Sequence, residues 1–204
     1  MYSPAYNKLE DRAELLKFLR ENNFPILVTG TGGVLHASHL PITVHEQGTQ
    51  IVIDMHMAKN NPQWREFLDD EVMVIFSGPH AYVSPRWYAD QERVPTWNYA
   101  AVHAYGIPKI IDDRKAKAES QRRLIESLDP EWLPKHDALS RKYVDLMLDG
   151  IVNFSIPVAR VETRWKLSQN RGRREMELIA AALEKSGDAG ELALAALTRK
   201  HLVD

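Results

Sequence analysis

The chain has 204 residues, of which 44% are hydrophobic and 26% charged, which is enough for one well-packed core. It contains no cysteine, so disulfide bridges, thiolate metal sites and cysteine nucleophiles are excluded. The formal net charge of −2 argues against a dedicated nucleic-acid-binding protein, which usually carries a basic excess. No apolar run is long enough to cross a bilayer, and Met1 leads into a polar segment rather than a signal peptide. We therefore expect a cytoplasmic protein.

The N-terminal part predicts one helix followed by paired strands. Asp11 and Glu14 form a capping box, and leucines at helical spacing extend the predicted helix to about Asn22. Residues 24–31 and 34–44 are rich in strand-forming residues and are joined by a Gly-Gly hairpin signal. A further turn leads into the strand 51–57. Three strands linked by hairpins predict an antiparallel meander.

The segment IVIDMHMAKNNPQW, residues 51–64, carries the strongest local signal. Its first half alternates between apolar and mixed positions, as expected of a strand with one buried face. Asn61 and Pro62 then predict a helix start, and we expect a short helix over residues 62–68 that buries Trp64, Phe67 and Leu68.

Lys59 and Asn60 lie where this strand ends and the short helix begins. Free backbone N–H groups and the positive end of the helix dipole would point to the same place, which makes an anion site. The turn therefore indicates a cradle for the phosphate of a cofactor, and the competing interpretation is a capped surface turn with a solvated lysine.

The rest of the chain alternates between long strands and helices. The predicted elements are strands at 71–77 (with a continuation at 81–84), 96–111 and 151–167, and helices at 112–128, 137–148, 173–185 and about 190–201. These elements predict a mixed β+α fold, a small closed antiparallel barrel with helices outside it. We expect one domain over residues 1–185 and a helical extension over 186–204.

Two common kinds of active site find little support. His36 and His39 are three residues apart on a strand and so face opposite sides, which makes a poor pair of metal ligands, and no HExxH motif is present. No G-x-S-x-G elbow, dinucleotide fingerprint or Walker loop occurs either.

Three polar segments remain as candidates beside Lys59. They are residues 37–41 (ASHLP), residues 96–99 (TWNY) and residues 165–171 (WKLSQNR). Together they offer cations for a phosphate, amides for a polar ring edge and aromatic side chains for a flat ring face. That inventory suits flavin mononucleotide, FMN.

Five motifs in one order resemble the PaiB-type FMN-binding proteins, negative transcriptional regulators within the split-barrel flavoproteins related to pyridoxamine phosphate oxidase. The motifs are HASHLPI, DMHMAKNNPQW, GPHAYVSPRWY, VPTWNYAAVHAYG and WKLSQNR, and the similarity runs from Met1 to about Leu183. The resemblance implies a split β-barrel homodimer with peripheral and C-terminal helices and with FMN at the subunit interface.

The resemblance also implies roles for residues at matching positions. Lys59 and Asn60, with the backbone after His56, would hold the phosphate of FMN. Ser38, His39, Leu40 and Pro41 would line the isoalloxazine ring. The remaining contacts would come from the same or the partner chain, through Thr96, Asn98, Lys166, Ser168, Gln169, Asn170 and Arg171.

The residues alone leave three alternatives open. The protein could be an FMN-dependent oxidoreductase that uses NADH, NADPH or a small substrate, although no residue stands out as a catalytic acid or base. It could bind DNA directly, for which a basic run between Arg164 and Arg174 is the sequence support. It could instead hold another flat ligand such as haem.

Overall fold

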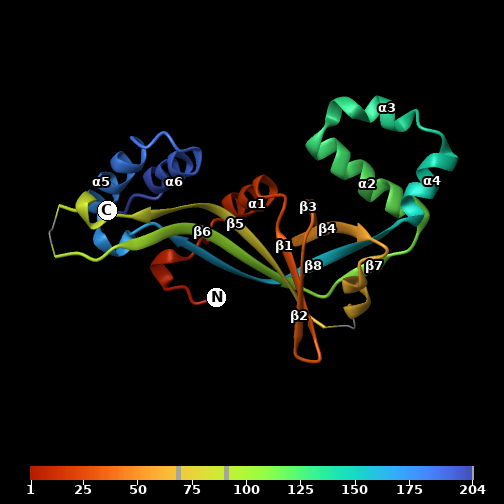
Figure 1. Ribbon diagram of the computed structural model, residues 1–204, viewed down its shortest axis with the longest axis horizontal. Coiled ribbons are helices and arrows are strands. Elements are labelled where there is room, and N and C mark those ends of the chain that lie inside the picture. The colour runs from red at the N-terminus through yellow and green to blue at the C-terminus, as the bar shows by residue number, and fades with distance from the viewer. Residues whose placement is uncertain (68–69, 90–91, 204) are drawn as a thin grey trace. The chain divides into compact units, whose positions relative to one another are not determined.

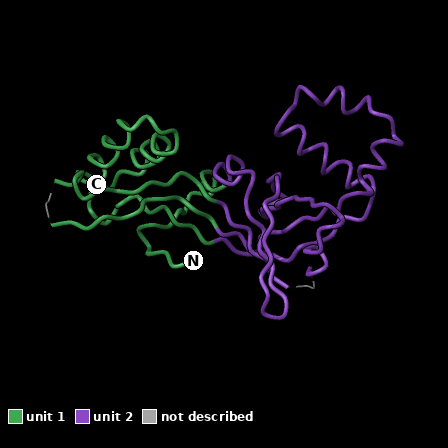
Figure 2. Tube along the Cα trace, in the orientation of Figure 1, with its two compact units in different colours: residues 1–15, 77–102, 162–204 green, residues 16–76, 103–161 purple. Residues whose placement is uncertain are grey.

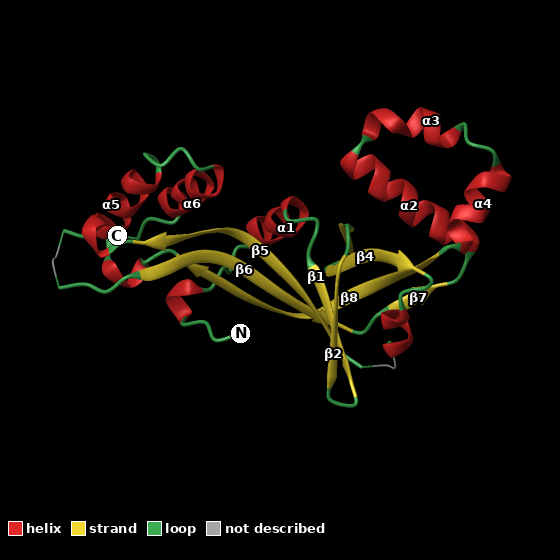
Figure 3. Cartoon of the chain, viewed as in Figure 1, coloured by secondary structure: helices red, strands yellow, loops and turns green. Residues whose placement is uncertain are grey.

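The computed structural model describes residues 1–67, 70–89 and 92–203, and its elements follow the predicted order (Figure 1, Figure 3). The strands are β1 (Ile26–Thr31), β2 (Val34–His39), β3 (Ile42–Gln47), β4 (Gln50–Ala58), β5 (Val72–Val83), β6 (Thr96–Gly106), β7 (Lys109–Ile111) and β8 (Ile151–Lys166). The α-helices are α1 (Arg12–Glu21), α2 (Arg114–Leu128), α3 (Leu133–Asp137), α4 (Arg141–Asp149), α5 (Arg173–Leu183) and α6 (Ala189–Lys200). Short 3-10 helices are η1 (Ala5–Asn7), η2 (Pro62–Glu66), η3 (Pro85–Trp87), η4 (Pro130–Trp132) and η5 (Gln169–Arg171).

The strands form one sheet in the order β2-β1-β5-β6-β8-β4-β3, and β7 pairs with β8. The strands at the two ends of this order, β2 and β3, are consecutive in the chain and are joined through Leu40 and Pro41 alone. A link of this length spans about 10 Å at most, so the two ends of the sheet must come together. The sheet is therefore rolled up, and the prediction of an antiparallel barrel is confirmed.

The predicted meander is wrong in its middle strand, whereas its second hairpin, between β3 and β4, is confirmed. Residues 34–44 form two strands rather than one, with β2 paired to β1 and β3 paired to β4. Pro41 has no N–H to give to a ladder, and the N–H groups of Leu40 and Ile42 donate to the carbonyls of Pro25 and Asn23. The first hairpin is confirmed, because Gly32 and Gly33 both have the positive φ that a tight type I′ turn requires.

The chain divides into two compact units, which Figure 2 colours separately. Unit 1 comprises residues 1–15, 77–102 and 162–204, and unit 2 comprises residues 16–76 and 103–161. Strands β5, β6 and β8 each contribute residues to both units.

The core of unit 2 lies between β4 and the strands around it. Ile53, Met55, Phe154 and Ile156 are nearly or fully buried there. The expectation that β4 has one open face is wrong, because Val52 and Asp54 on its other face are also buried. Helix α2 covers that face, and its Arg123 forms an ion pair with Asp54 at 2.6 Å.

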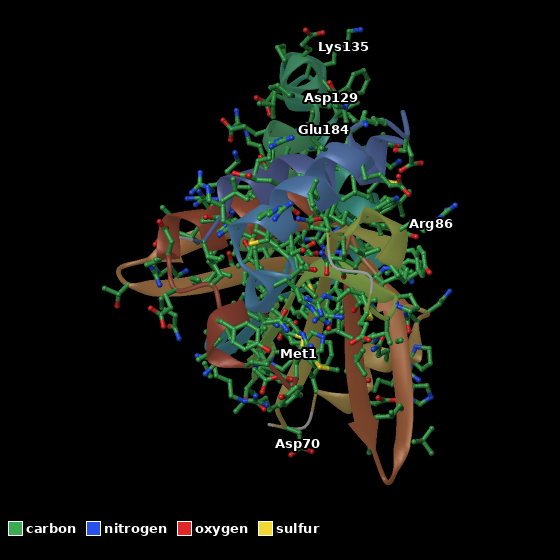
Figure 4. All side chains as sticks on the ribbon, turned by 90° about the vertical axis from the view of Figure 1, so that its left-hand side faces the viewer. Met1, Asp70, Arg86, Asp129, Lys135 and Glu184 are labelled. Carbon is green, nitrogen blue, oxygen red and sulfur yellow. The ribbon has the colours of Figure 1, made fainter. Side chains whose placement is uncertain are left out.

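Residues 114–149, which contain α2, η4, α3 and α4, form a helical insert of unit 2 between β7 and β8. Asp113 caps α2 by accepting from the N–H of Ala116, and Ser140 caps α4 by accepting from the N–H of Tyr143. The second helix was expected to begin at residue 137, but α4 begins after this serine cap. Figure 4 labels Asp129, at the end of α2 in the insert.

Unit 1 has a core of its own. Trp165 and Leu167 at the end of β8 are buried, as are Met176, Ile179 and Leu183 of α5. Helix α6 packs against α5 with Leu194 and Ala195 fully buried. The expected boundary after residue 185 falls in the turn between these two helices and stays a prediction.

Two strand boundaries differ from the expectation. Strand β5 continues through Gly78 and Pro79 without a break. Strand β6 ends at Gly106, where an added Cβ atom would lie 2.3 Å from the carbonyl oxygen of Pro157. Glycine is required at that point because the backbone of β8 approaches so closely.

None of the described helices is long and apolar enough to cross a membrane.

Candidate functional site

The turn after β4 carries an available cation. Lys59 and Asn60 are both exposed, and the backbone N–H of Lys59 donates to the carbonyl of Gly150 at 2.9 Å. Within residues 1–67, 70–89 and 92–203, no carboxylate is paired with the Lys59 ammonium. The backbone of the turn is thus fixed against the start of β8, while the ammonium stays open to an anion.

The short helix after this turn differs from the expectation. It is a 3-10 helix of 5 residues, and its cap residue Asn61 already accepts from the N–H of Gln63 at 3.0 Å. The N–H of Asn61 donates to the carbonyl of Ala58. The N–H groups of Lys59, Asn61 and Gln63 therefore have acceptors within the protein. The N–H of Asn60 has no backbone acceptor among the described residues, so the backbone contact with a phosphate stays a prediction for that one donor. Leu68, which was expected to be buried here, lies outside the described residues.

Burial in η2 also differs from the expectation. Trp64 and Phe67 are only half-buried, whereas Gln63 is 2% exposed. The Gln63 amide donates to the carbonyls of Leu27 and His36 and to the hydroxyl of Thr29, each at 3.2 Å. Gln63 therefore anchors η2 to the β1–β2 hairpin. A buried glutamine leaves no periodic signal, so the sequence did not identify it.

The segment from Ser38 to Pro41 lies at the junction of β2 and β3, on the same side of unit 2 as η2. The Ser38 hydroxyl accepts from the side-chain amide of Asn61 at 3.0 Å. The His39 ring is exposed and lies 5.8 Å from the ring of Phe24, whereas Leu40 is buried. The structure thus connects the two predicted segments of unit 2 through one hydrogen bond between Ser38 and the turn after β4.

In unit 1, Asn98 and Ser168 satisfy one another. The Asn98 amide donates to the Ser168 hydroxyl at 3.0 Å, and the same hydroxyl donates back to the Asn98 oxygen at 3.1 Å. Asn98 is fully buried, and Ser168 has φ 68°, the one positive φ of a non-glycine residue among those described. Such backbone is strained and persists only where its surroundings hold it. The geometry gives Asn98 a structural role, which is to fix the turn after β8.

The other predicted site residues of unit 1 lie around the same turn. Lys166 donates to the Thr96 hydroxyl, and burial together with the nearby charge of Arg164 lowers the pKa of the Lys166 ammonium. The side chain of Gln169 accepts from the N–H of Leu167 at 2.8 Å. Asn170 and Arg171 are exposed, and the Arg171 guanidinium lies 5.9 Å from the centre of the Tyr88 ring.

His56 differs from the other candidates of unit 2 in its surroundings. Its side chain lines a cavity of about 310 Å³ that is otherwise formed by the helical insert and Ile151. Burial lowers the pKa of its imidazole, so the ring is neutral at pH 7.

The fourteen predicted residues thus fall into two groups, one in each unit. In unit 2 they are Ser38, His39, Leu40, Pro41, His56, Lys59 and Asn60, and in unit 1 they are Thr96, Asn98, Lys166, Ser168, Gln169, Asn170 and Arg171. The donor chemistry fits FMN, because an ammonium with no carboxylate partner among the described residues suits a phosphate, and exposed amide and guanidinium groups suit a polar ring edge. Among the residues that the structure describes, no group of three or more His, Asp and Glu side chains could hold a metal ion.

Comparisons with known proteins bear on both the fold and the cofactor. The family model described as "Putative FMN-binding domain" matches residues 1–160. A Bacillus subtilis (strain 168) relative, "Protease synthase and sporulation protein PAI 2", is 36% identical over 209 residues, covering 99% of this chain and 98% of its own.

Two solved structures share the fold. The flavocytochrome Anf3 from Azotobacter vinelandii has a TM-score of 0.58 at 17% identity, covering 77% of this chain and 68% of that chain. The FAD and haem binding protein from Mycobacterium smegmatis has a TM-score of 0.58 at 16% identity, covering 78% of this chain and 72% of that chain.

Proposed function

This chain belongs to the FMN-binding family whose model matches it, with a split-barrel fold and FMN as its cofactor, and from that premise we propose which residues hold the flavin. Lys59 and Asn60 bind the phosphate of FMN. Ser38 and its neighbours as far as Pro41 line the isoalloxazine ring.

The open ammonium of Lys59 is the observation that carries this proposal. A phosphate needs a cation that is not already neutralised, and Lys59 has no carboxylate partner within the described residues. Its backbone is held by the hydrogen bond to Gly150, so less freedom is lost when the anion binds. The hydrogen bond from Asn61 to Ser38 links the phosphate turn to the segment proposed to line the ring.

The donors of unit 1 complete the proposed set. We propose that the protein is a homodimer and that Thr96, Lys166, Gln169, Asn170 and Arg171 contact a flavin. Asn98 and Ser168 contribute by shaping the turn, because their side chains already satisfy one another. When bound, FMN supplies a ring that can exchange electrons, and the residues named here bind and orient it.

We propose further that the protein acts as a negative regulator of transcription in the cytoplasm. The support is the 36% identity to the relative named "Protease synthase and sporulation protein PAI 2", which covers 98% of that protein. A DNA contact belongs to the same proposal. Retardation of the DNA fragment upstream of its own gene, with a steep salt dependence, is the expected result. Steady oxidation of NADH or NADPH without DNA binding would instead identify an oxidoreductase.

The flavin proposal is tested by spectroscopy of the purified protein. We expect a yellow protein from which acid releases FMN, and a dimer by light scattering. Lys59→Gln should weaken FMN binding by about tenfold in a fluorescence titration, the effect of losing one partly exposed charged contact. Lys109→Gln, at an exposed lysine of the same unit, should leave the affinity unchanged. Equal affinity in the wild type and the Lys59 variant would contradict the assignment.

A further inference from the structure

The cavity lined by His56, which we name the insert cavity, has a volume of about 310 Å³ and lies within unit 2. Its lining comes mostly from the helices of the insert, which form an open ring in Figure 3, and otherwise from His56 and Ile151. An apolar cavity of about 150 Å³ is enough to hold benzene, so this volume has room for a ligand of about two fused rings.

The apolar part of the lining is left partly open to water. Leu139 is 37% exposed and Met147 is 48% exposed, although both line the cavity. Leu148 is the one apolar residue of α2, α3 and α4 that is buried. A ligand with an apolar body would therefore remove apolar surface from water when it enters.

Some polar groups of the lining have no partner in the part of the chain that the structure describes. The side-chain amide of Gln121 and the ring nitrogens of His56 form no hydrogen bond there, and both side chains keep accessible surface. In His136, Nδ1 lies 3.3 Å from a carboxylate oxygen of Asp137. A carboxylate oxygen can only accept, so Nδ1 carries the proton and Nε2 of the neutral ring is left as an acceptor. Tyr143 also lines the cavity, but it is half exposed, so water can satisfy its hydroxyl.

The charges in and around the cavity favour an uncharged ligand. Among the described residues, no Asp, Glu, Lys or Arg side chain lines it. Burial lowers the pKa of the His56 imidazole, which is therefore neutral at pH 7. The nearby ammonium of Lys117 is occupied, since it donates to the carbonyls of Leu148 and Ile151 at 3.1 Å each. A charged ligand would lose its hydration here without gaining an opposite charge.

The acceptor of His136 and the amide of Gln121 belong to the same end of the cavity. Arg122 of α2 and Asp137 of α3 form an ion pair at 3.3 Å, and Gln121 and His136 directly precede these two residues in the chain. Both Gln121 and His136 line the cavity. An acceptor beside an amide that can donate is the pairing that suits a hydroxyl group, which donates one hydrogen bond and accepts others.

We propose that the insert cavity binds a small, uncharged aromatic molecule that carries a hydroxyl group. The hydroxyl donates to Nε2 of His136 and accepts from the side-chain amide of Gln121. The aromatic body lies against the apolar residues of α2 and α4, where the sulfur of Met147 offers a favourable ring contact. This site goes beyond the flavin site and does not depend on it.

The test uses the full-length protein with FMN bound, at pH 8, and three probes with the same two-ring body. 2-Naphthol has the hydroxyl, 2-methoxynaphthalene has an oxygen that cannot donate, and 2-naphthoate carries a charge. Binding is followed by chemical-shift changes in backbone amide spectra, and the flavin absorbance is recorded in the same samples. We expect 2-naphthol to shift signals of residues 114–151 and to bind about fivefold more tightly than 2-methoxynaphthalene, the ratio for one hydrogen bond. 2-Naphthoate should bind at least about tenfold more weakly than 2-naphthol.

Three results with these probes would overturn the proposal. The first is no binding of 2-naphthol, and the second is equal binding of 2-naphthol and either of the other probes. The third is a change in the flavin absorbance when 2-naphthol is added, because the probe would then lie on the flavin rather than in the insert cavity.

Variants separate the hydrogen bond from the shape of the cavity. His136→Phe keeps a flat ring and removes the acceptor, so it should weaken 2-naphthol about fivefold and leave 2-methoxynaphthalene unchanged. Ala118→Leu should fill the cavity from α2 and block both probes, whereas Ala116→Leu adds the same bulk to α2 at a residue outside the lining and should bind both as the wild type does. Circular dichroism confirms that each variant is folded. An equal loss of both probes in His136→Phe, or retained binding of 2-naphthol in Ala118→Leu, contradicts the proposal.

Discussion

Arg123→Met should destabilise the protein, because it leaves the buried carboxylate of Asp54 without its guanidinium. Asp54 is 4% exposed on β4, and the Arg123 nitrogen lies 2.6 Å from its oxygen. This pair fastens α2 of the helical insert to the outer face of the sheet. Methionine keeps most of the apolar stem of arginine, so the loss should come mainly from the charge.

The size of the effect follows from the burial of each partner. Removing one partner of a fully buried ion pair costs about 3–5 kcal/mol. The Arg123 side chain is 42% exposed, and His45 lies 3.8 Å from the same carboxylate, so water and the imidazole can partly replace the lost contact. We therefore expect a loss of about 2 kcal/mol in the free energy of unfolding. In the double variant Asp54→Asn, Arg123→Met the loss should be smaller than the sum of the two single losses.

Urea unfolding at pH 7, with FMN at one fixed concentration, measures these differences. Arg122→Met is the matched control, because Arg122 is the residue before Arg123 in α2 and pairs with Asp137 in an exposed position. The control should change stability far less than Arg123→Met. A loss below about 0.5 kcal/mol for Arg123→Met would refute the reasoning, since it would mean that the buried carboxylate does not depend on its partner.

Three further predictions concern the core and the buried imidazole. Asn98→Leu should cost about 2 kcal/mol in urea unfolding, because it leaves the Ser168 hydroxyl buried without its partner; a neutral result would contradict the role given to this pair. Gly106→Ala should cost about 2 kcal/mol or more, since the new Cβ would meet the carbonyl of Pro157, and an unchanged midpoint would show that β8 yields easily. For His56, the lowered pKa means that the imidazole binds a proton more readily in the unfolded protein than in the folded one. The stability associated with the neutral, buried imidazole is therefore fully present above pH 6.5, and it is lost as the pH falls through and below that value. Unfolding at pH 7.5 and 5.5 should show a smaller loss of stability in His56→Gln than in the wild type, and equal losses would show that His56 does not contribute.

Local patterns predicted most elements because each carries its own signal. The cap at Asp11, the hairpin glycines and the paired cap residues Asn61 and Pro62 all act within a few residues, and the structure confirms each of them. The other half of the predicted capping box is not formed, because the Glu14 carboxylate pairs with Lys200 and His201. The barrel itself also followed from a count of strands and short turns. The division of residues 34–44 into β2 and β3, which lie at opposite ends of the strand order, could not be predicted in this way. It depends on where the N–H groups of Leu40 and Ile42 find acceptors.

The features that the sequence did not predict come from contacts between distant segments. The outer face of β4 is buried because α2 covers it, some 70 residues later in the chain. The anchoring of η2 by Gln63 needs three acceptors from another hairpin. The mutual pairing of Asn98 and Ser168 gives both side chains a partner within the protein, and their expected contact with the flavin stays a prediction. A single polar residue in a sequence cannot show whether its partner is a ligand or another side chain.

The central claim is that Lys59 binds the phosphate of FMN, and comparing FMN with riboflavin tests it most directly. Riboflavin has the same ring and ribityl chain but lacks the phosphate. The apoprotein should therefore prefer FMN, and Lys59→Gln should reduce that preference by about tenfold while riboflavin affinity stays the same. An unchanged preference, or an equal loss of affinity for both flavins, would show that Lys59 does not act on the phosphate.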